Sequence, residues 1–290
     1  MMRGSVASLK TAAKRVLPPI IVDWIQHVRR AMSGIAPEWE YLPDGWSTKD
    51  DWVKRWADPT VAKTQKAKWA EFVRLTKGTG PLGVAFEAPI IENRDCYAHH
   101  IVMAYAYVLA LAARKKDRIA LLDWGGGIGH YLMFSRSLLP GVDIDYCCID
   151  LPSLCEAGRE VLPEAQFINR ETEVVGRRYD LVLVSGALQC AKDWKSSARL
   201  LASIANPYLY VTRAPFVRRN QSFVALQRMY AYGYDTEIMY WFLNQGEFLE
   251  YMASLDLELV REFVFDKHPL VEDAPEQADI QGFLFRRRGA

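Results

Sequence analysis

The stretch "LLDWGGGIGHY", residues 121–131, places three consecutive glycines directly after a run of apolar residues that ends at an acid. Glycine costs stability inside regular structure, so a cluster of this kind needs a local reason. The residues around it, "RIALLDW" before and "GHYLMFSRSLL" after, predict a short buried strand and a helix. A strand, a glycine loop and a helix in this order predict a ligand held against the backbone, beyond the carboxyl end of the strand.

The same alternation of strand and helix continues down the chain, and continuous apolar strands between helices are typical of a parallel sheet covered on both faces. No helix-length segment separates the last two predicted strands, so we expect them to form an antiparallel pair. The fold predicted is α/β: a doubly wound, mostly parallel seven-stranded sheet with an N-terminal helical extension. Its strands are expected at residues 118–124, 143–150, 165–169, 179–186, 208–213, 257–265 and 280–287.

The chain has 290 residues, half of them hydrophobic, which is enough for one substantial core. Residues 1–48 are expected to form an amphipathic segment followed, from residue 36, by a linker rich in Pro, Gly and Trp. Residues 49–116 are expected to form a helical cap region. Residues 117–290 would then be the ligand-binding domain. Within it, residues 214–256 are expected to be a largely helical aromatic insertion that acts as a lid or substrate wall.

Charge and cysteine usage exclude several classes of protein. Lys and Arg number 36 and Asp and Glu number 35, which gives a net charge of +1. A general nucleic-acid binder usually carries a clear basic excess, so no nucleic-acid partner is expected. The five cysteines include no CxxC pair, which speaks against a disulfide framework or a metal site and favours a reducing cytoplasm.

The N-terminal residues 10–30 carry apolar side chains at helical spacing, flanked by Lys and Arg. No apolar run of the sequence is long enough to cross a bilayer. One interpretation is an interfacial helix on an anionic membrane surface, which would make the protein membrane-peripheral. The other is a helix that packs on its own domain or on a partner.

The glycine spacing and two carboxylates narrow the choice of ligand. Gly125, Gly127 and Gly129 read GxGxG, whereas the dinucleotide fingerprint GxGxxG would need a glycine where His130 stands. Asp150 ends the second predicted strand, where a carboxylate can accept both hydroxyls of a ribose. The acid two residues before the first glycine suits an ammonium group better than a pyrophosphate. Together these features favour S-adenosylmethionine.

The glycine stretch followed by "LPGVDIDYCCIDLPSLCEAG" resembles the class I S-adenosylmethionine-dependent methyltransferases, and the small-molecule O-methyltransferases in particular. The whole chain also resembles a group of bacterial methyltransferases associated with surface-polysaccharide gene clusters. The resemblance implies a methyltransferase that uses S-adenosyl-L-methionine. It further implies O-methylation of a small molecule or of a sugar or glycolipid precursor, and a role in polysaccharide biosynthesis.

The resemblance also implies roles for ten residues of this chain. They divide among the methionine end of the cofactor, its ribose, its adenine and the methyl-transfer side of the pocket. The methionine end would be held by Asp123, Gly125, Gly126, Gly127 and Gly129, and the ribose by Asp150. The adenine would be contacted by Leu151 and Asn169, and the methyl-transfer side would be lined by Ser185 and Gly186.

Many O-methyltransferases place a proton-accepting histidine shortly after the fourth strand, and this chain does not. The comparable stretch, "SGALQCAKDW", offers Gln189 instead. Replacements for the base are His99 and His100, in the helix expected before the first strand, while His130 and His268 are further candidates. For each histidine, a solvated or core position is the alternative. Methyl transfer needs a base only when the acceptor is a poorly acidic hydroxyl. The missing histidine therefore bears on the identity of the acceptor and of the base more than on whether the protein transfers a methyl group.

Two classes of function stay open beside methyl transfer. A catalytically inactive binding or scaffold protein could keep the same fold and bind the cofactor without turnover. A nicotinamide-dependent oxidoreductase is disfavoured by the failed fingerprint. Two features of the acceptor side also have two interpretations each. Arg213, Arg218 and Arg219 could meet a phosphate-bearing substrate or form a solvated basic face, and the aromatic rings of the insertion could stack on a sugar or pack in the core.

Overall fold

A computed structural model of the chain describes residues 36–46 and 55–289. Residues 39–290 form one compact unit. The amphipathic segment expected over residues 10–30 lies outside the described residues. Within the described part of the chain, no helix combines the length and the apolar character that a membrane span requires.

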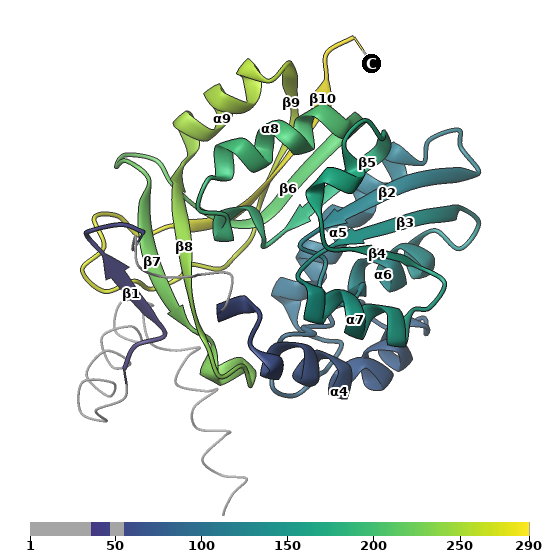
Figure 1. Cartoon of the computed structure of the whole chain (residues 1–290), viewed down its shortest axis with the longest axis horizontal. Helices are drawn as coiled ribbons and strands as arrows, with labels where there is room; N and C mark the ends of the chain where they lie inside the picture. The colour runs from purple at the N-terminus through teal and green to yellow at the C-terminus, as the bar shows by residue number, and fades with distance from the viewer. Residues whose placement is uncertain (1–35, 47–54, 290) are drawn as a thin grey trace, which may run out of the picture. The chain divides into compact units, whose positions relative to one another are not determined.

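The centre of the unit is a parallel sheet whose strands are buried on both faces (Figure 1). In β5 (Tyr179–Ser185), Leu181 and Leu183 pack on one face while Val182 and Val184 pack on the other. Because side chains alternate along a strand, burial on both faces requires a continuous apolar run, which is what the sequence shows. The parallel strands lie in the order β4 (Gln166–Ile168), β3 (Asp143–Ile149), β2 (Arg118–Trp124), β5 and β6 (Ala205–Val217).

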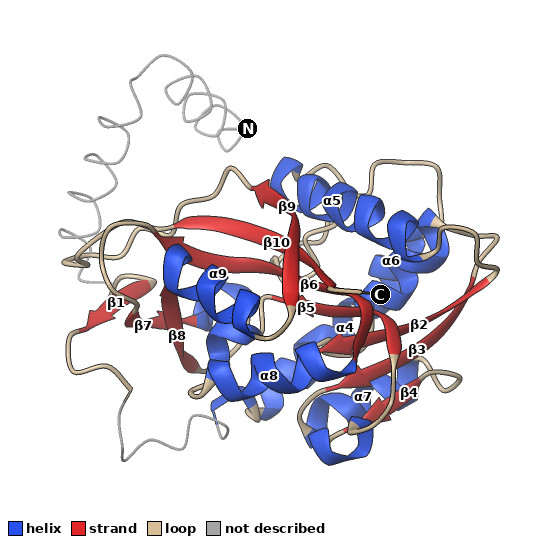
Figure 2. Cartoon of the chain, turned by 90° about the horizontal axis from the view of Figure 1, so that it is seen from above, coloured by secondary structure: helices blue, strands red, loops and turns tan. Residues whose placement is uncertain are grey.

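Helices cover both faces of this sheet (Figure 2). Apolar side chains of α5 (Cys96–Ala112) and α6 (His130–Leu138) pack on one face, and those of α8 (Trp194–Ile204) and α9 (Gln245–Ser254) on the other. The two remaining α-helices, α4 (Pro59–Thr76) and α7 (Pro152–Val161), pack against each other. Short 3-10 helices are η1 (Glu171–Val174), η2 (Leu188–Cys190) and η3 (Met229–Tyr232).

The C-terminal strands β9 (Leu257–Val264) and β10 (Asp279–Arg287) form the expected antiparallel pair. β10 also pairs antiparallel with β6, so it inserts between β6 and β9. These two strands and the five parallel ones make up the seven that the sequence predicts. The predicted α/β architecture is therefore confirmed.

The expected strand count and the expected helical insertion are wrong. Within the described residues the sheet has ten strands, because residues 214–256 contribute β7 (Phe223–Arg228) and β8 (Glu237–Asn244) before α9 begins. The predicted linker contributes β1 (Trp39–Leu42), which pairs with β7. Cross-strand aromatic contacts stabilise this extension: Phe223 stacks on Phe242 with ring centroids 5.0 Å apart, and Trp39 meets Phe242 edge-on.

Candidate active site

The loop between β2 and α6 is built from glycines because its neighbours leave no room for side chains. Gly125 and Gly127 have positive φ values of 73° and 61°, which L side chains rarely adopt. A Cβ on Gly127 would also lie 2.9 Å from Oε1 of Gln65. A Cβ on Gly126 would collide with the carboxylate of Asp123. The loop therefore runs close to two polar side chains and leaves open space on its outer side.

Asp123 is buried at the end of β2, with 1% of its surface exposed. The hydroxyl of Tyr146 donates a hydrogen bond to its Oδ2 at 2.6 Å. Its Oδ1 is also buried and has no hydrogen-bond partner among the described residues. Burial raises the pKa of Asp123 to about 7, and the nearby Asp150 carboxylate acts in the same direction against the Tyr146 hydrogen bond.

Asp150 follows β3, and both of its carboxylate oxygens are fixed by backbone donors. The amide of Gly127 donates to Oδ2 and that of Leu151 to Oδ1, each at 2.7 Å. Burial raises the pKa of Asp150 to about 6, while these two hydrogen bonds act in the opposite direction. Each oxygen keeps a free lone pair, so the carboxylate can accept two further hydrogen bonds from a pair of hydroxyls.

A cavity of about 270 Å³ lies over the glycine loop, slightly smaller than the range of about 300–1,000 Å³ for ligand pockets. It collects nine of the ten residues predicted to bind the cofactor. Gly129 is the exception: it caps α6 and packs toward Leu162 and Phe167. The nine are Asp123, Gly125, Gly126, Gly127, Asp150, Leu151, Asn169, Ser185 and Gly186.

The structure does not bring His99, His100 or Gln189 to the cavity wall. His100 is exposed on α5 and His99 is half-buried on the same helix. Gln189 is buried in η2, where its Nε2 donates to the backbone carbonyl of Arg213 at 3.2 Å. Its role in this structure is to hold a neighbouring strand residue in place. None of the three residues predicted to be catalytic therefore lines the cavity in this structure.

His130 does line the cavity, but it behaves as an aromatic wall. Its ring stacks on Phe86 with centroids 4.1 Å apart and meets Phe72 edge-on at 4.7 Å. Burial, together with the nearby cations Arg213 and Lys68, lowers the pKa of His130 to about 3. A ring that stays neutral down to about pH 3 is a weak base at neutral pH.

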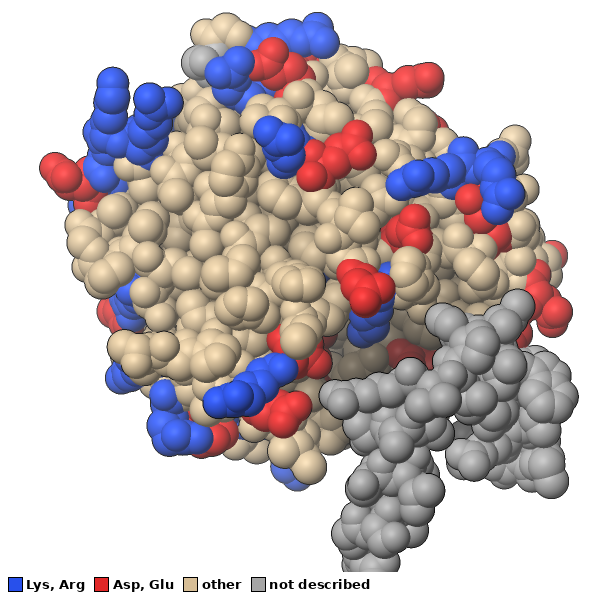
Figure 3. Space-filling view, turned by 180° about the vertical axis from the view of Figure 1, so that it is seen from behind, with Lys and Arg blue, Asp and Glu red and all other residues tan. Residues whose placement is uncertain are grey.

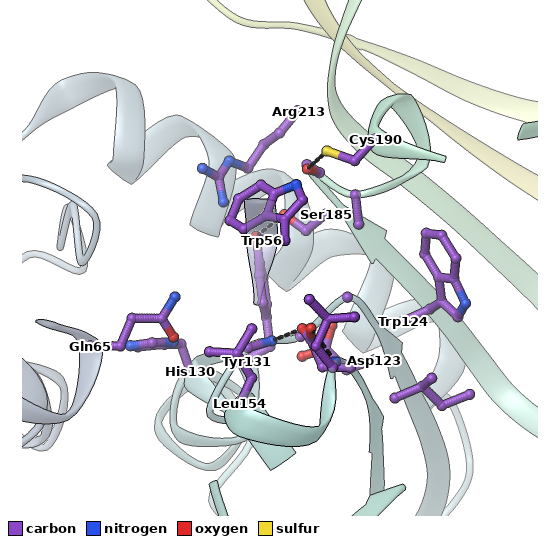
Figure 4. A pocket seen from close by; sticks show the side chains of 18 of the residues that line it. Trp56, Gln65, Asp123, Trp124, His130, Tyr131, Leu154, Ser185, Cys190 and Arg213 are labelled. Carbon is purple, nitrogen blue, oxygen red and sulfur yellow. Dashed lines mark hydrogen bonds between the residues drawn. The ribbon is translucent and has the colours of Figure 1, made fainter. Parts of the chain in front are cut away.

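An ion pair lines the cavity: the guanidinium of Arg213, a residue within β6 (Figure 4), binds the carboxylate of Glu87. Arg213 has a positive φ of 59°, a strained conformation for a non-glycine residue. Burial alone would lower the pKa of Arg213, but the Glu87 carboxylate raises it, so the guanidinium stays charged. Arg213 is the only Lys or Arg among the described residues that line the cavity.

Several cavity residues carry no motif and were not predicted from the sequence: Trp56, Gln65, Phe86 and Glu87. Of the aromatic residues expected in the insertion, Tyr234 lines the cavity, while Tyr230 is 55% exposed and Tyr240 is buried in the core. Arg218 and Arg219 do not line the cavity; both residues are exposed, and their backbone amides donate to Glu276. No group of three His, Cys, Asp or Glu side chains in the described part of the chain could hold a metal ion.

No protein-family model matches the chain, and no curated protein matches it in sequence. Solved structures are similar to it in fold. A protein from Galdieria sulphuraria, provisionally identified as a sarcosine dimethylglycine methyltransferase, is 13% identical with a TM-score of 0.50. The match covers 78% of this chain and 98% of that protein. The likeness shows that the chain has the Rossmann-like fold of the class I methyltransferases.

Two further structures match with lower TM-scores. The 1,6-didemethyltoxoflavin-N1-methyltransferase of Burkholderia thailandensis, with bound 1,6-didemethyltoxoflavin and S-adenosylhomocysteine, is 12% identical with a TM-score of 0.45. The match covers 84% of this chain and 93% of that enzyme. The magnesium protoporphyrin IX methyltransferase of Synechocystis PCC 6803, with bound S-adenosylhomocysteine, is 13% identical with a TM-score of 0.43, and the match covers 78% and 98%.

Proposed function

We propose that the protein is an S-adenosyl-L-methionine-dependent methyltransferase that methylates a hydroxyl oxygen. One observation carries the cofactor assignment: two carboxylates flank a single glycine loop, and each has free hydrogen-bonding capacity. Asp123 keeps a buried oxygen with no partner in the described part of the chain, and Asp150 has both oxygens oriented by backbone amides. An ammonium group and a pair of ribose hydroxyls are the ligand groups that these two acceptors would satisfy.

The other cavity residues fit the remaining parts of this cofactor. Leu151 offers an apolar surface to the adenine, and Asn169 at the end of β4 offers an amide to its edge. Ser185 and Gly186 lie at the end of β5, at the side where the acceptor would approach. When bound, the cofactor supplies a methyl group on a positively charged sulfur. The protein's own residues then have to align an acceptor oxygen with that methyl group.

The acceptor is proposed to be a small molecule or a sugar or glycolipid precursor, as in polysaccharide biosynthesis. Its binding site would lie beside the ion pair of Glu87 and Arg213, between the aromatic rings of Trp56 and Tyr234. Charged pairs and aromatic faces are surfaces on which a polar ring can hydrogen-bond and stack. Transfer to a hydroxyl releases one proton, and because the Glu87 carboxylate is already paired with Arg213, that proton passes to solvent.

We infer the location and the partners on the same basis. The five cysteines are free, as a reducing cytoplasm favours. A glycolipid precursor would be presented at a membrane surface, which the basic amphipathic residues 10–30 could contact in a membrane-peripheral protein. Those residues lie outside the described part of the chain, so this contact rests on the sequence.

Calorimetric titration with S-adenosylmethionine and S-adenosylhomocysteine tests the cofactor assignment. We expect micromolar affinity, about −8 kcal/mol, for the native protein. The variant Asp150→Ala should lose it, because the ribose hydroxyls lose their acceptor. Asp145→Ala is the matched control, since Asp145 lies on β3, the strand that Asp150 follows, with its side chain 59% exposed. No binding to the native protein would refute the proposal. Binding without transfer of a labelled methyl group to any acceptor would favour the non-catalytic scaffold.

A further inference from the structure

Gln65 is a buried polar residue on a helix outside the motif region. It lies on α4 with 7% of its surface exposed, among apolar neighbours that include the fully buried Val61 and Phe72. A buried amide costs free energy unless its hydrogen bonds are made. The Nε2 of Gln65 makes only a long hydrogen bond of 3.5 Å to the hydroxyl of Tyr234. Its Oε1 has no partner among the described residues.

The unpartnered oxygen points at the glycine loop. A Cβ built on Gly127 would lie 2.9 Å from Oε1 of Gln65, so the loop passes this amide too closely for a side chain at position 127. Figure 4 shows the Gln65 side chain beside His130 at the cavity wall, with Asp123 on the other side of the cavity. α4 therefore places the Gln65 amide against the glycine loop at Gly127, while Asp123 contacts the same loop at Gly126.

Two buried acceptors thus flank consecutive glycines, and neither has a donor among the described residues. Oδ1 of Asp123 lies on the Gly126 side of the loop, and Oε1 of Gln65 lies on the Gly127 side. The guanidinium of Arg213 is bound to Glu87. A ligand that satisfies both acceptors must bring N–H donors of its own, and a primary ammonium group carries three.

We infer that Gln65 binds the α-ammonium group of the cofactor's amino-acid end, opposite Asp123. This inference rests on the proposed function, because it names a residue of the same site. In this arrangement α4 and the turn that carries Tyr234 close over the amino-acid end and leave the nucleoside end to Asp150. Gln65 is then a binding residue from the N-terminal helical region, 58 positions before the motif aspartate.

Two ligands that differ by the amino-acid group test the inference. S-adenosylhomocysteine carries it, and 5′-methylthioadenosine lacks it. In calorimetric titrations we expect Gln65→Ala to weaken binding of S-adenosylhomocysteine about 10- to 100-fold, the range for a buried hydrogen bond to a charged group. Binding of 5′-methylthioadenosine should stay within about twofold of the native value, which also shows that the variant is folded. Asp150→Ala should weaken both ligands.

Two more variants sharpen the result. Thr64→Val is the matched control: it removes the exposed hydrogen bond from the neighbouring Thr64 to the carbonyl of Gly233, and Thr64 does not line the cavity. It should leave S-adenosylhomocysteine binding unchanged. Gln65→Glu keeps acceptor oxygens at the site, so it should keep the affinity for S-adenosylhomocysteine if residue 65 faces the ligand's ammonium group. If residue 65 faced the ligand's carboxylate instead, the added negative charge would repel it and weaken binding.

The outcomes separate cleanly. If the native protein binds neither ligand, the proposed function fails and this inference falls with it. If the native protein binds S-adenosylhomocysteine and Gln65→Ala binds it equally well, only the role of Gln65 is refuted. Equal losses for both ligands in Gln65→Ala would assign the residue to the nucleoside, and a loss in Gln65→Glu would rule out the ammonium group.

Discussion

At the scale of single residues, Asp123 has a proposed binding role, and its buried carboxyl lowers the stability of the folded protein at neutral pH. Its folded pKa of about 7 lies above the ordinary value of 3.8. The folded protein therefore holds a proton that the unfolded chain releases between these two values. Stability contributed by this group is present below about pH 3.8 and is lost as the pH rises toward 7. The full gap corresponds to about 4 kcal/mol.

The variant Asp123→Asn cannot ionise, so it should not lose stability as the pH rises from about 3.8 toward 7. We expect it to unfold at a higher denaturant concentration than the native protein at pH 8, by up to about 4 kcal/mol in unfolding free energy. At pH 4.5 the advantage should shrink to about 1 kcal/mol, because the native carboxyl is then protonated in the folded state. Denaturation curves at the two pH values measure the difference. An advantage of the same size at both would show that ionisation of Asp123 is not its cause.

At the scale of elements, the loop between β9 and β10 is fastened to the end of β6 by one carboxylate. Glu276 accepts hydrogen bonds from the backbone amides of Arg218, Arg219 and Asn220 at 3.0, 2.9 and 2.8 Å. Burial would raise the pKa of Glu276, but these donors lower it to about 2. The fastening is therefore complete above the ordinary pKa of 4.5 and is lost as the pH falls from there toward 2.

We expect Glu276→Gln to destabilise the protein at pH 7 by about 1–3 kcal/mol, the range for losing hydrogen bonds to a charged group. The deficit should shrink at pH 3, because part of the stability contributed by the native carboxylate is lost there. Asp273→Asn removes a charge from an exposed position of the same loop and serves as the control. Thermal unfolding of the three proteins at both pH values measures the deficit. A deficit that does not change with pH would contradict the assignment.

Elements coded by contiguous residues were predictable, and those coded by distant pairs were not. The strand, loop and helix around the glycines follow from local spacing, and so does the C-terminal strand pair. β1 could not be predicted because its partner β7 lies about 185 positions away, and its aromatic rings become half-buried only when the two strands meet. The expectation that residues 214–256 are largely helical fails for the same reason, since strand formation depends on the side chains of the neighbouring strand.

The candidate site divides in the same way. Nine motif residues reach the cavity because they follow consecutive strand ends of one parallel sheet. Glu87 and Gln65 arrive from segments that carry no motif. For Gln65 a signal was nevertheless present: Val61, Gln65 and Trp69 recur at intervals of four, so a polar residue stands on the buried face of a predicted helix. A polar residue in that position requires a partner.

At the scale of the whole molecule, charge is distributed unevenly between the described part and the N-terminal residues. On the face shown in Figure 3, basic and acidic side chains are interspersed. The N-terminal residues 10–30, by contrast, contain five Lys and Arg and a single acid, Asp23. Each basic residue near an anionic membrane surface contributes about 1 kcal/mol to binding. This segment is where the sequence predicts attraction to such a surface.

We therefore expect the full chain to co-sediment with vesicles that contain phosphatidylserine, and only weakly with neutral phosphatidylcholine vesicles. Replacing Lys10, Lys14 and Arg15 with Gln should weaken binding to the anionic vesicles about 100-fold, as three lost charges predict. Added salt should weaken the native protein in the same direction, because the attraction is screened.

A matched variant separates this local effect from net charge. Lys63, Lys77 and Lys115 are exposed in the described part of the chain, and their replacement with Gln removes the same total charge. Vesicle binding that survives this change but not the N-terminal one would assign the contact to residues 10–30. Equal losses would mean that the whole surface attracts the vesicle. No loss in either variant would contradict the prediction, because neither set of basic side chains would then contribute to the contact.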